Sequence, residues 1–218
     1  MIISSAQALS FLVAASILTI SPGPDNLMVL SIGLSKGKKQ GVAFGVGCSL
    51  GCLLHTLLVS VGLSALIAAS ETALMVLKIA GGLYLIWLGI QALKSRGINW
   101  SKQPDAVLED MPLIRYFRRG LIANAINPKV ILFFLALLPR FINNEQGHIG
   151  LQSAQLGLLF TLQSAIIFGL IGWFAGKIGD QLKQHPAVGI WLDRVAGVLF
   201  IILGVSLQFA QLQTFQQG

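Results

Sequence analysis

Six long apolar stretches, separated by short polar connections, organise this chain of 218 residues. They cover residues 6–35, 41–69, 72–93, 120–141, 151–176 and 187–210. Each exceeds the roughly 20 residues that a helix needs to cross a hydrocarbon core of about 30 Å. Within lipid, a single segment satisfies its own backbone groups only as a helix. The pattern therefore predicts an all-α membrane protein with six transmembrane helices.

The composition excludes several other classes of protein. Apolar residues make up 55% of the chain and charged residues 11%, against about 25% charged in ordinary soluble domains. Too few polar residues are present to cover a soluble enzyme, a disordered regulator or a nucleic-acid-binding domain. The net charge of +7 fits basic cytoplasmic loops, and no nucleic-acid partner is expected.

The basic residues indicate an orientation in the membrane. Eleven of them lie in the first, third and fifth connections, whereas Arg140 is the one basic residue in the other connections and the ends. The excess of Lys and Arg in cytoplasmic loops then places both termini outside. The chain is expected to form one transmembrane domain over 1–218, with halves 1–93 and 114–218 joined by a cytoplasmic linker, 94–113.

The two halves share a weak repeat. Gly82 and Gly89 have the same spacing as Gly197 and Gly204, at an offset of 115 residues. With three spans in each half, the second half would enter the membrane from the opposite side, as in many secondary transporters. Chance is the alternative, because glycine is frequent in membrane helices. We expect two inverted three-helix repeats.

The first helix is interrupted by the run Pro22-Gly23-Pro24-Asp25-Asn26. Two prolines around a glycine should break the helix, because proline lacks an N–H and clashes with the preceding turn. Asp25 and Asn26 are then expected to cap a second half-helix.

The fourth helix carries a matching interruption, Asn127-Pro128-Lys129, 104 residues after the first. Asparagine is a good N-cap, and proline fits the first helical position. Paired interruptions in two halves are the best sequence indication of a transport site, with positive half-helix ends turned toward anionic groups. Helices one and four are therefore predicted to be broken at the binding site.

Asp25 and Lys129 fall at similar depth in the membrane. Asp25 lies 11 residues before Lys36 and Lys129 lies 10 after Arg119, or about 16 and 15 Å along a helix. A lone charge there costs at least about 2.5–3.5 kcal/mol. The two residues are expected to compensate each other, either as part of a binding site or as a tie between helices. Asp193, near the start of the sixth stretch, is expected at the cytoplasmic interface.

One face of the second helix has two interpretations. Its Cys and His side chains, with Asp25, could bind a soft metal cation. Alternatively, its small residues allow close helix packing, which we favour, so no metal site or cofactor is predicted. The face consists of Gly41, Gly45, Cys48, Cys52 and His55.

Several of these motifs resemble a known family. The run Ser21–Asp25, the Asn127-Pro128-Lys129 break and the stretch 81–85 followed by Gly89 are similar to the signatures of the lysine-exporter (LysE/RhtB-type) translocators. The resemblance extends over the whole chain in length and span count. It implies a bacterial inner-membrane exporter of amino acids or their derivatives, working by secondary transport with proton exchange.

These considerations predict a proton-coupled antiporter that works by alternating access on neutral amino acids such as homoserine, threonine or leucine. The expected site comprises Pro22, Gly23, Pro24, Asp25, Asn26, Asn127, Pro128 and Lys129. A homo-oligomer is possible. A cation exporter that uses Asp25, Cys48, Cys52 and His55 is the alternative; an enzyme is not expected, because no known catalytic motif is present.

Overall fold

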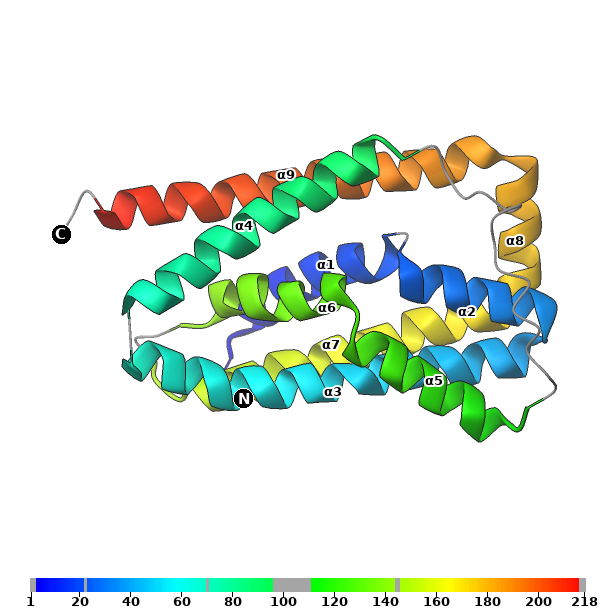
Figure 1. Cartoon of the computed structure of the whole chain (residues 1–218), viewed down its shortest axis with the longest axis horizontal. Coiled ribbons are helices and arrows are strands. Elements are labelled where there is room, and N and C mark those ends of the chain that lie inside the picture. The colour runs from blue at the N-terminus through cyan, green and yellow to red at the C-terminus, as the bar shows by residue number, and fades with distance from the viewer. Residues whose placement is uncertain (1–2, 22, 70, 96–110, 144–145, 216–218) are drawn as a thin grey trace.

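The computed structural model describes residues 3–21, 23–69, 71–95, 111–143 and 146–215, and every regular element in these ranges is a helix (Figure 1). The helices are α1 Ser5–Ile20, α2 Pro24–Ser35, α3 Lys38–Ala69, α4 Glu71–Leu93, α5 Leu113–Ala125, α6 Pro128–Leu132, the π-helical turn η2 Phe133–Leu137, the 3-10 turn η3 Leu138–Phe141, α7 Ile149–Trp173, α8 Ala175–Gln184 and α9 Pro186–Phe215.

Several helices are long and apolar enough to cross a membrane. Three qualify alone, through Lys38–Gly62, Ile149–Trp173 and Ala187–Ser206. Two further spans result if each bent pair is one span: α1 with α2, at 56°, and α5 with Pro128–Phe141, at 49°. The all-helical, multi-span expectation is confirmed. In α4, the part that qualifies as apolar, Ile79–Leu93, is shorter than a full span.

Two boundaries differ from the expected ones because of amphipathic segments. α5 starts at Leu113 rather than at residue 120, since its first turns expose Arg118 and bury Tyr116. The connection expected after the fifth stretch contains α8, which packs against α2 through Gly179 and Leu34. Hydropathy alone does not detect such helices, because their polar face lowers the average.

Glycines set the distance between α4 and α9, which run side by side along one edge of the molecule (Figure 1). A Cβ added to Gly82 would lie 3.1 Å from the carbonyl oxygen of Gly204, and one added to Gly89 would lie 2.6 Å from that of Gly197. The two motifs of the expected repeat therefore face each other across one helix pair.

α3 packs most extensively against α7 and α5. A Cβ on Gly41 would lie 3.2 Å from Gly172, and one on Gly45 would lie 3.0 Å from the backbone oxygen of Phe168. On the other side, Gly47 meets the backbone of α5. The close packing expected for Gly41 and Gly45 is confirmed.

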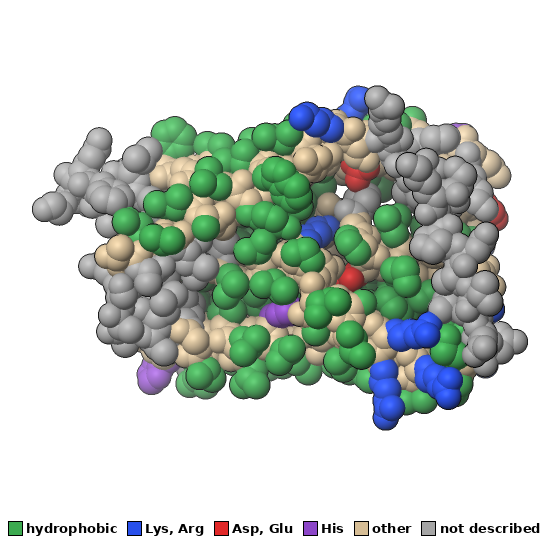
Figure 2. All heavy atoms as spheres, in the orientation of Figure 1, with side chains coloured by type: hydrophobic (Ala, Val, Ile, Leu, Met, Phe, Trp, Pro, Cys, Tyr) green, Lys and Arg blue, Asp and Glu red, His purple; other side chains and the backbone are tan. Residues whose placement is uncertain are grey.

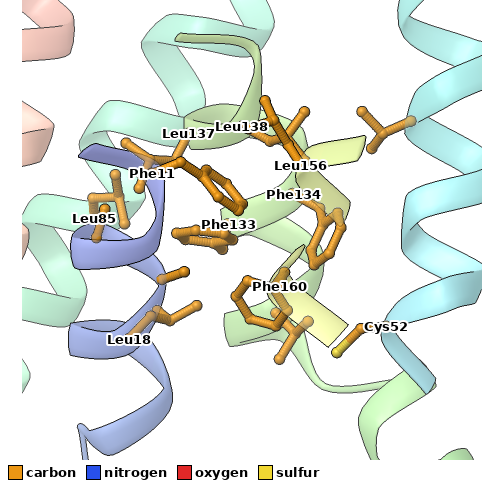
Figure 3. Packing of buried hydrophobic residues seen from close by; sticks show 14 of the residues in the cluster. Phe11, Leu18, Cys52, Leu85, Phe133, Phe134, Leu137, Leu138, Leu156 and Phe160 are labelled. Atoms are coloured by element: carbon orange, nitrogen blue, oxygen red, sulfur yellow. The ribbon is translucent and has the colours of Figure 1, made fainter. Parts of the chain in front are cut away.

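Four phenylalanines form the centre of the larger core cluster (Figure 3). The ring of Phe160 lies 5.2 Å from that of Phe133 and 5.1 Å from that of Phe134, and Phe11 completes the group. Both neighbours of Phe160 come from η2, whose wider turn places consecutive phenylalanines in the core. This cluster borders the candidate site described next.

Candidate functional site

The break between α1 and α2 is built around Gly23. This residue is the N-cap of α2 in an extended conformation, with Pro24 in the first turn and no side chain capping the helix. Asn26 does not cap α2 as expected; its amide instead donates to the carbonyl of Thr19, at 2.7 Å. Because α1 ends at Ile20, its last carbonyls lack helical partners, and Asn26 satisfies one of them.

The second break follows the expected geometry. Asn127 is the N-cap of α6, its side-chain oxygen accepts from the backbone N–H of Lys129 at 3.0 Å, and Pro128 lies in the first turn. α6 is only five residues long before the chain widens into η2. Both predicted interruptions are therefore present, each with a proline that starts the second half.

Asp25, in the first turn of α2, is 4% exposed. The amide of Asn124, near the end of α5, donates to its carboxylate at 2.8 Å. Hydrogen bonds of this kind stabilise a buried carboxylate that lies away from water. The two breaks are thus joined through Asp25.

Lys129 reaches across to the other break. Its ammonium donates to the backbone carbonyl of Ser21 at 2.8 Å and lies 5.8 Å from the ring centroid of Phe200. A Cβ on Gly23 would be 3.1 Å from this nitrogen, so glycine leaves room for it. Asp25 and Lys129 therefore lie near the same break, but Lys129 bonds to Ser21 while Asp25 bonds to Asn124.

A pocket lies where these groups converge, and it has both polar and apolar walls. Asp25 and Lys129 supply one charge of each sign, and Phe160 and Phe168 supply aromatic surface. Figure 2 shows a few charged side chains in the middle of a largely hydrophobic face of the molecule. The lining residues are Leu18, Thr19, Gly23, Asp25, Asn26, Asn124, Asn127, Lys129, Val130, Phe160 and Phe168.

The expected site residues fall into those that line the pocket and those that do not. Five of them line the pocket: Gly23, Asp25, Asn26, Asn127 and Lys129. Pro24 and Pro128 instead start the half-helices behind it. Pro22 lies outside the described residues.

Sequence reasoning missed Asn124, which connects three helices. Besides Asp25, it contacts α3, where the Cys52 thiol donates to its side-chain oxygen at 3.3 Å and His55 Nε2 lies 3.2 Å from its backbone oxygen. A polar residue four positions before Pro128 was the available signal. The aromatic walls Phe160 and Phe168 carried no signal, because phenylalanine is ordinary in an apolar stretch.

The residues of the possible metal face have other partners. Cys52 and His55 both bond to Asn124, whose amide in turn donates to Asp25. Cys48 is buried opposite Gly120 of α5. Within the described ranges, no group of three or more His, Cys, Asp or Glu side chains is arranged to hold a metal ion.

Asp193 is enclosed by neighbouring helices, which the sequence did not indicate; its position at the cytoplasmic interface stays a prediction. It is 7% exposed in α9, and the hydroxyl of Ser95, just after α4, donates to its carboxylate. Its burial follows from the close approach of α4 and α9 at Gly89 and Gly197, which the hydropathy pattern does not show.

Comparison with known proteins agrees with the motifs. The sequence model of the LysE type translocators matches residues 16–211. The homoserine/homoserine lactone efflux protein of Salmonella typhi is 30% identical over 202 residues, covering 93% of this chain and 96% of the relative. The threonine efflux protein of Escherichia coli K12 is 25% identical over 198 residues, covering 86% and 90%. No solved structure matches the chain. The chain belongs to the LysE type translocator family, whose members are membrane transporters rather than enzymes.

Proposed function

We propose that this protein exports small amino acids with uncharged side chains, homoserine and threonine among them, from the cytoplasm in exchange for protons. The observation that carries the proposal is the pocket between the two helix breaks, in which one carboxylate and one ammonium face the same space. This balance of charge suits a zwitterion. The relatives named for efflux of homoserine and threonine support the same substrate class.

The chemistry of the pocket suggests an orientation for the substrate. Asp25 accepts the substrate ammonium, because it is the acidic residue that lines the pocket. Lys129 and the uncapped first turn of α2 receive the substrate carboxylate, as expected for a helix N-terminus. The small substrate side chain then faces Phe160 and Phe168.

Proton exchange would use the same carboxylate. Asp25 binds either the substrate ammonium or a proton, so the two occupy the site in turn and their movements are coupled. Alternating access then requires that the breaks turn the pocket toward one side of the membrane at a time.

An inverted repeat of six spans is consistent with the glycine contacts. At an offset of 115, Gly82 corresponds to Gly197 and Gly89 to Gly204. Gly82 contacts Gly204, and Gly89 contacts Gly197. If a two-fold axis relates the two halves, each such contact must occur twice, once for each pair of equivalent residues. The contact of Gly82 with Gly204 then requires the contact of Gly197 with Gly89.

The proposed location is the bacterial cytoplasmic membrane, with both termini outside. Figure 1 shows both ends of the chain toward the left of the molecule, with α8 and the α2–α3 connection at the right. Lys and Arg side chains gather over the right half of the face seen in Figure 2. Both features support the orientation that basic cytoplasmic loops favour.

The test uses proteoliposomes loaded with radiolabelled L-homoserine. Under an imposed proton gradient, the intact protein should release homoserine faster than without the gradient. Asp25→Asn should abolish the gradient-driven part, whereas Asp180→Asn, at an exposed carboxylate of α8, should not. Gradient-driven release by Asp25→Asn at the normal rate would exclude Asp25 from coupling.

A further inference from the structure

Asp193 is a second buried carboxylate that the proposed transport cycle has not used. It is 7% exposed, and Asp25 is 4% exposed. They are the two acidic residues classed as buried within the ranges that the structure describes. Burying an ionised carboxylate is expensive unless a cation or hydrogen-bond donors compensate it. The Ser95 hydroxyl donates to Asp193, which leaves its charge to be balanced.

Among the described residues, Lys129 is the partly buried basic group that faces this part of α9. Phe200, whose ring faces the Lys129 ammonium at 5.8 Å, lies on α9 seven residues after Asp193. Seven residues are two helical turns, about 10.5 Å along the same face. Lys129 also interacts electrostatically with both Asp25 and Asp193. The other basic residues next to Asp193, Arg194 on α9 and Lys94 at the end of α4, are exposed.

In the described conformation, the ammonium of Lys129 donates to the carbonyl of Ser21. Each carboxylate has its own neutral donor, Asn124 for Asp25 and Ser95 for Asp193. The ammonium is thus placed beside the α1–α2 break and facing α9. A four-carbon side chain with rotatable donors can redirect its charge by changing rotamer.

We propose that Asp193 is the alternative partner of Lys129 and receives the lysine ammonium when Asp25 is protonated. This exchange rests on the proposed function for the protonation of Asp25. Two carboxylates and one ammonium leave one negative charge when all are ionised. One proton on Asp25 balances that charge, and Lys129 then pairs with the carboxylate that stays ionised, Asp193.

The exchange predicts that the two carboxylates substitute for each other. With Asp25 neutralised, Lys129 turns to Asp193; with Asp193 neutralised, it turns to Asp25. Removing both leaves a cation in the membrane interior without a counter-charge. Removing one partner of a buried pair is strongly destabilising, so the loss should appear in full only in the double variant.

The test needs no ligand. Melting temperatures of the purified full-length protein in detergent are compared for Asp25→Asn, Asp193→Asn, their combination, and the combination with Lys129→Met. The double variant should melt about 10 °C below the value expected from adding the single effects. Lys129→Met should restore most of that loss, because it removes the unpaired cation. Asp180→Asn is the matched control for replacing an exposed carboxylate.

Each outcome bears on the exchange. Additive melting temperatures, or no recovery on adding Lys129→Met, would overturn it. If the double variant does not accumulate in the membrane, the triple variant should, and its failure would also count against the exchange. Asp193→Glu keeps the negative charge. The double variant Asp25→Asn with Asp193→Glu should therefore have the melting temperature of Asp25→Asn alone. Absence of homoserine export by the intact protein would refute the proposed function instead and leave this stability cycle standing.

Discussion

Replacing Asn124 with leucine tests whether Asp25 works through the donors around it. Asn124 donates to the Asp25 carboxylate at 2.8 Å, and its own side chain is 1% exposed. Leucine has a similar branched shape, is somewhat larger and has no donor. A hydrogen bond to a charged group contributes about 1.5–3 kcal/mol, which corresponds to about 10–150-fold in binding. Because Asn127 and Lys129 also line the pocket beside Asp25, we expect the lower end, a loss of about tenfold.

The loss should be specific to substrate binding. Without the Asn124 donor, the ionised form of the buried Asp25 carboxylate is less well stabilised. Less of that form is available to a substrate ammonium, so the homoserine concentration at half-maximal counterflow should rise about tenfold. The assay is counterflow of radiolabelled homoserine in proteoliposomes, with protein amount and melting temperature measured on the same preparations.

Ser49→Ala provides the matched control. Ser49 is also fully buried, but its hydroxyl bonds to the carbonyl of Gly45 in its own helix. It should leave the half-maximal concentration unchanged. A folded Asn124→Leu protein with a half-maximal concentration within about twofold of wild type would refute the reasoning, because the donor would then contribute less than about 0.5 kcal/mol.

Two further predictions concern packing and orientation. Replacing Cys48 and Cys52 together with alanine should leave homoserine counterflow in proteoliposomes largely intact, because alanine preserves close packing. Gly45→Leu should reduce the folded yield measured by fluorescence-detected size exclusion, since a Cβ there already lies 2.9 Å from α7. In the cysteine-free protein, a cysteine at Gln146 should react with a membrane-impermeant maleimide in intact cells and one at Gln103 should not; the reverse pattern would overturn the orientation.

The breaks could be predicted from the sequence because proline acts locally. Pro24 and Pro128 interrupt a helix whatever packs around them, so the positions of Asp25 and Lys129 at two helix ends followed from the chain alone. Their similar depth in the membrane, counted from the 1.5 Å rise of a helix, stays a prediction. Similar depth and matching breaks made a shared pocket a reasonable expectation.

The partners of these charges could not be predicted in the same way, because they depend on how helices from distant parts of the chain pack. Asn124 bonds to Asp25 because the bend between α5 and α6 brings the end of α5 beside the first turn of α2. No local pattern specifies the direction of that bend. The expected ion pair of Asp25 with Lys129 therefore differs from the arrangement found, in which Lys129 bonds to Ser21.

Asp193 shows that distance along a helix does not tell how far neighbouring helices enclose a side chain. Counted from the start of its stretch, it lies where side chains usually reach the polar interface. The glycine contacts between α4 and α9 bring these helices so close that Ser95 and α9 enclose the carboxylate. Since such an enclosure needs small residues on both helices, the repeated glycine spacing that indicated an inverted repeat also contains the reason for the burial of Asp193. A sequence reading that paired Gly89 with Gly197 as contacts, rather than only as equivalent motifs, would have placed Ser95 beside Asp193.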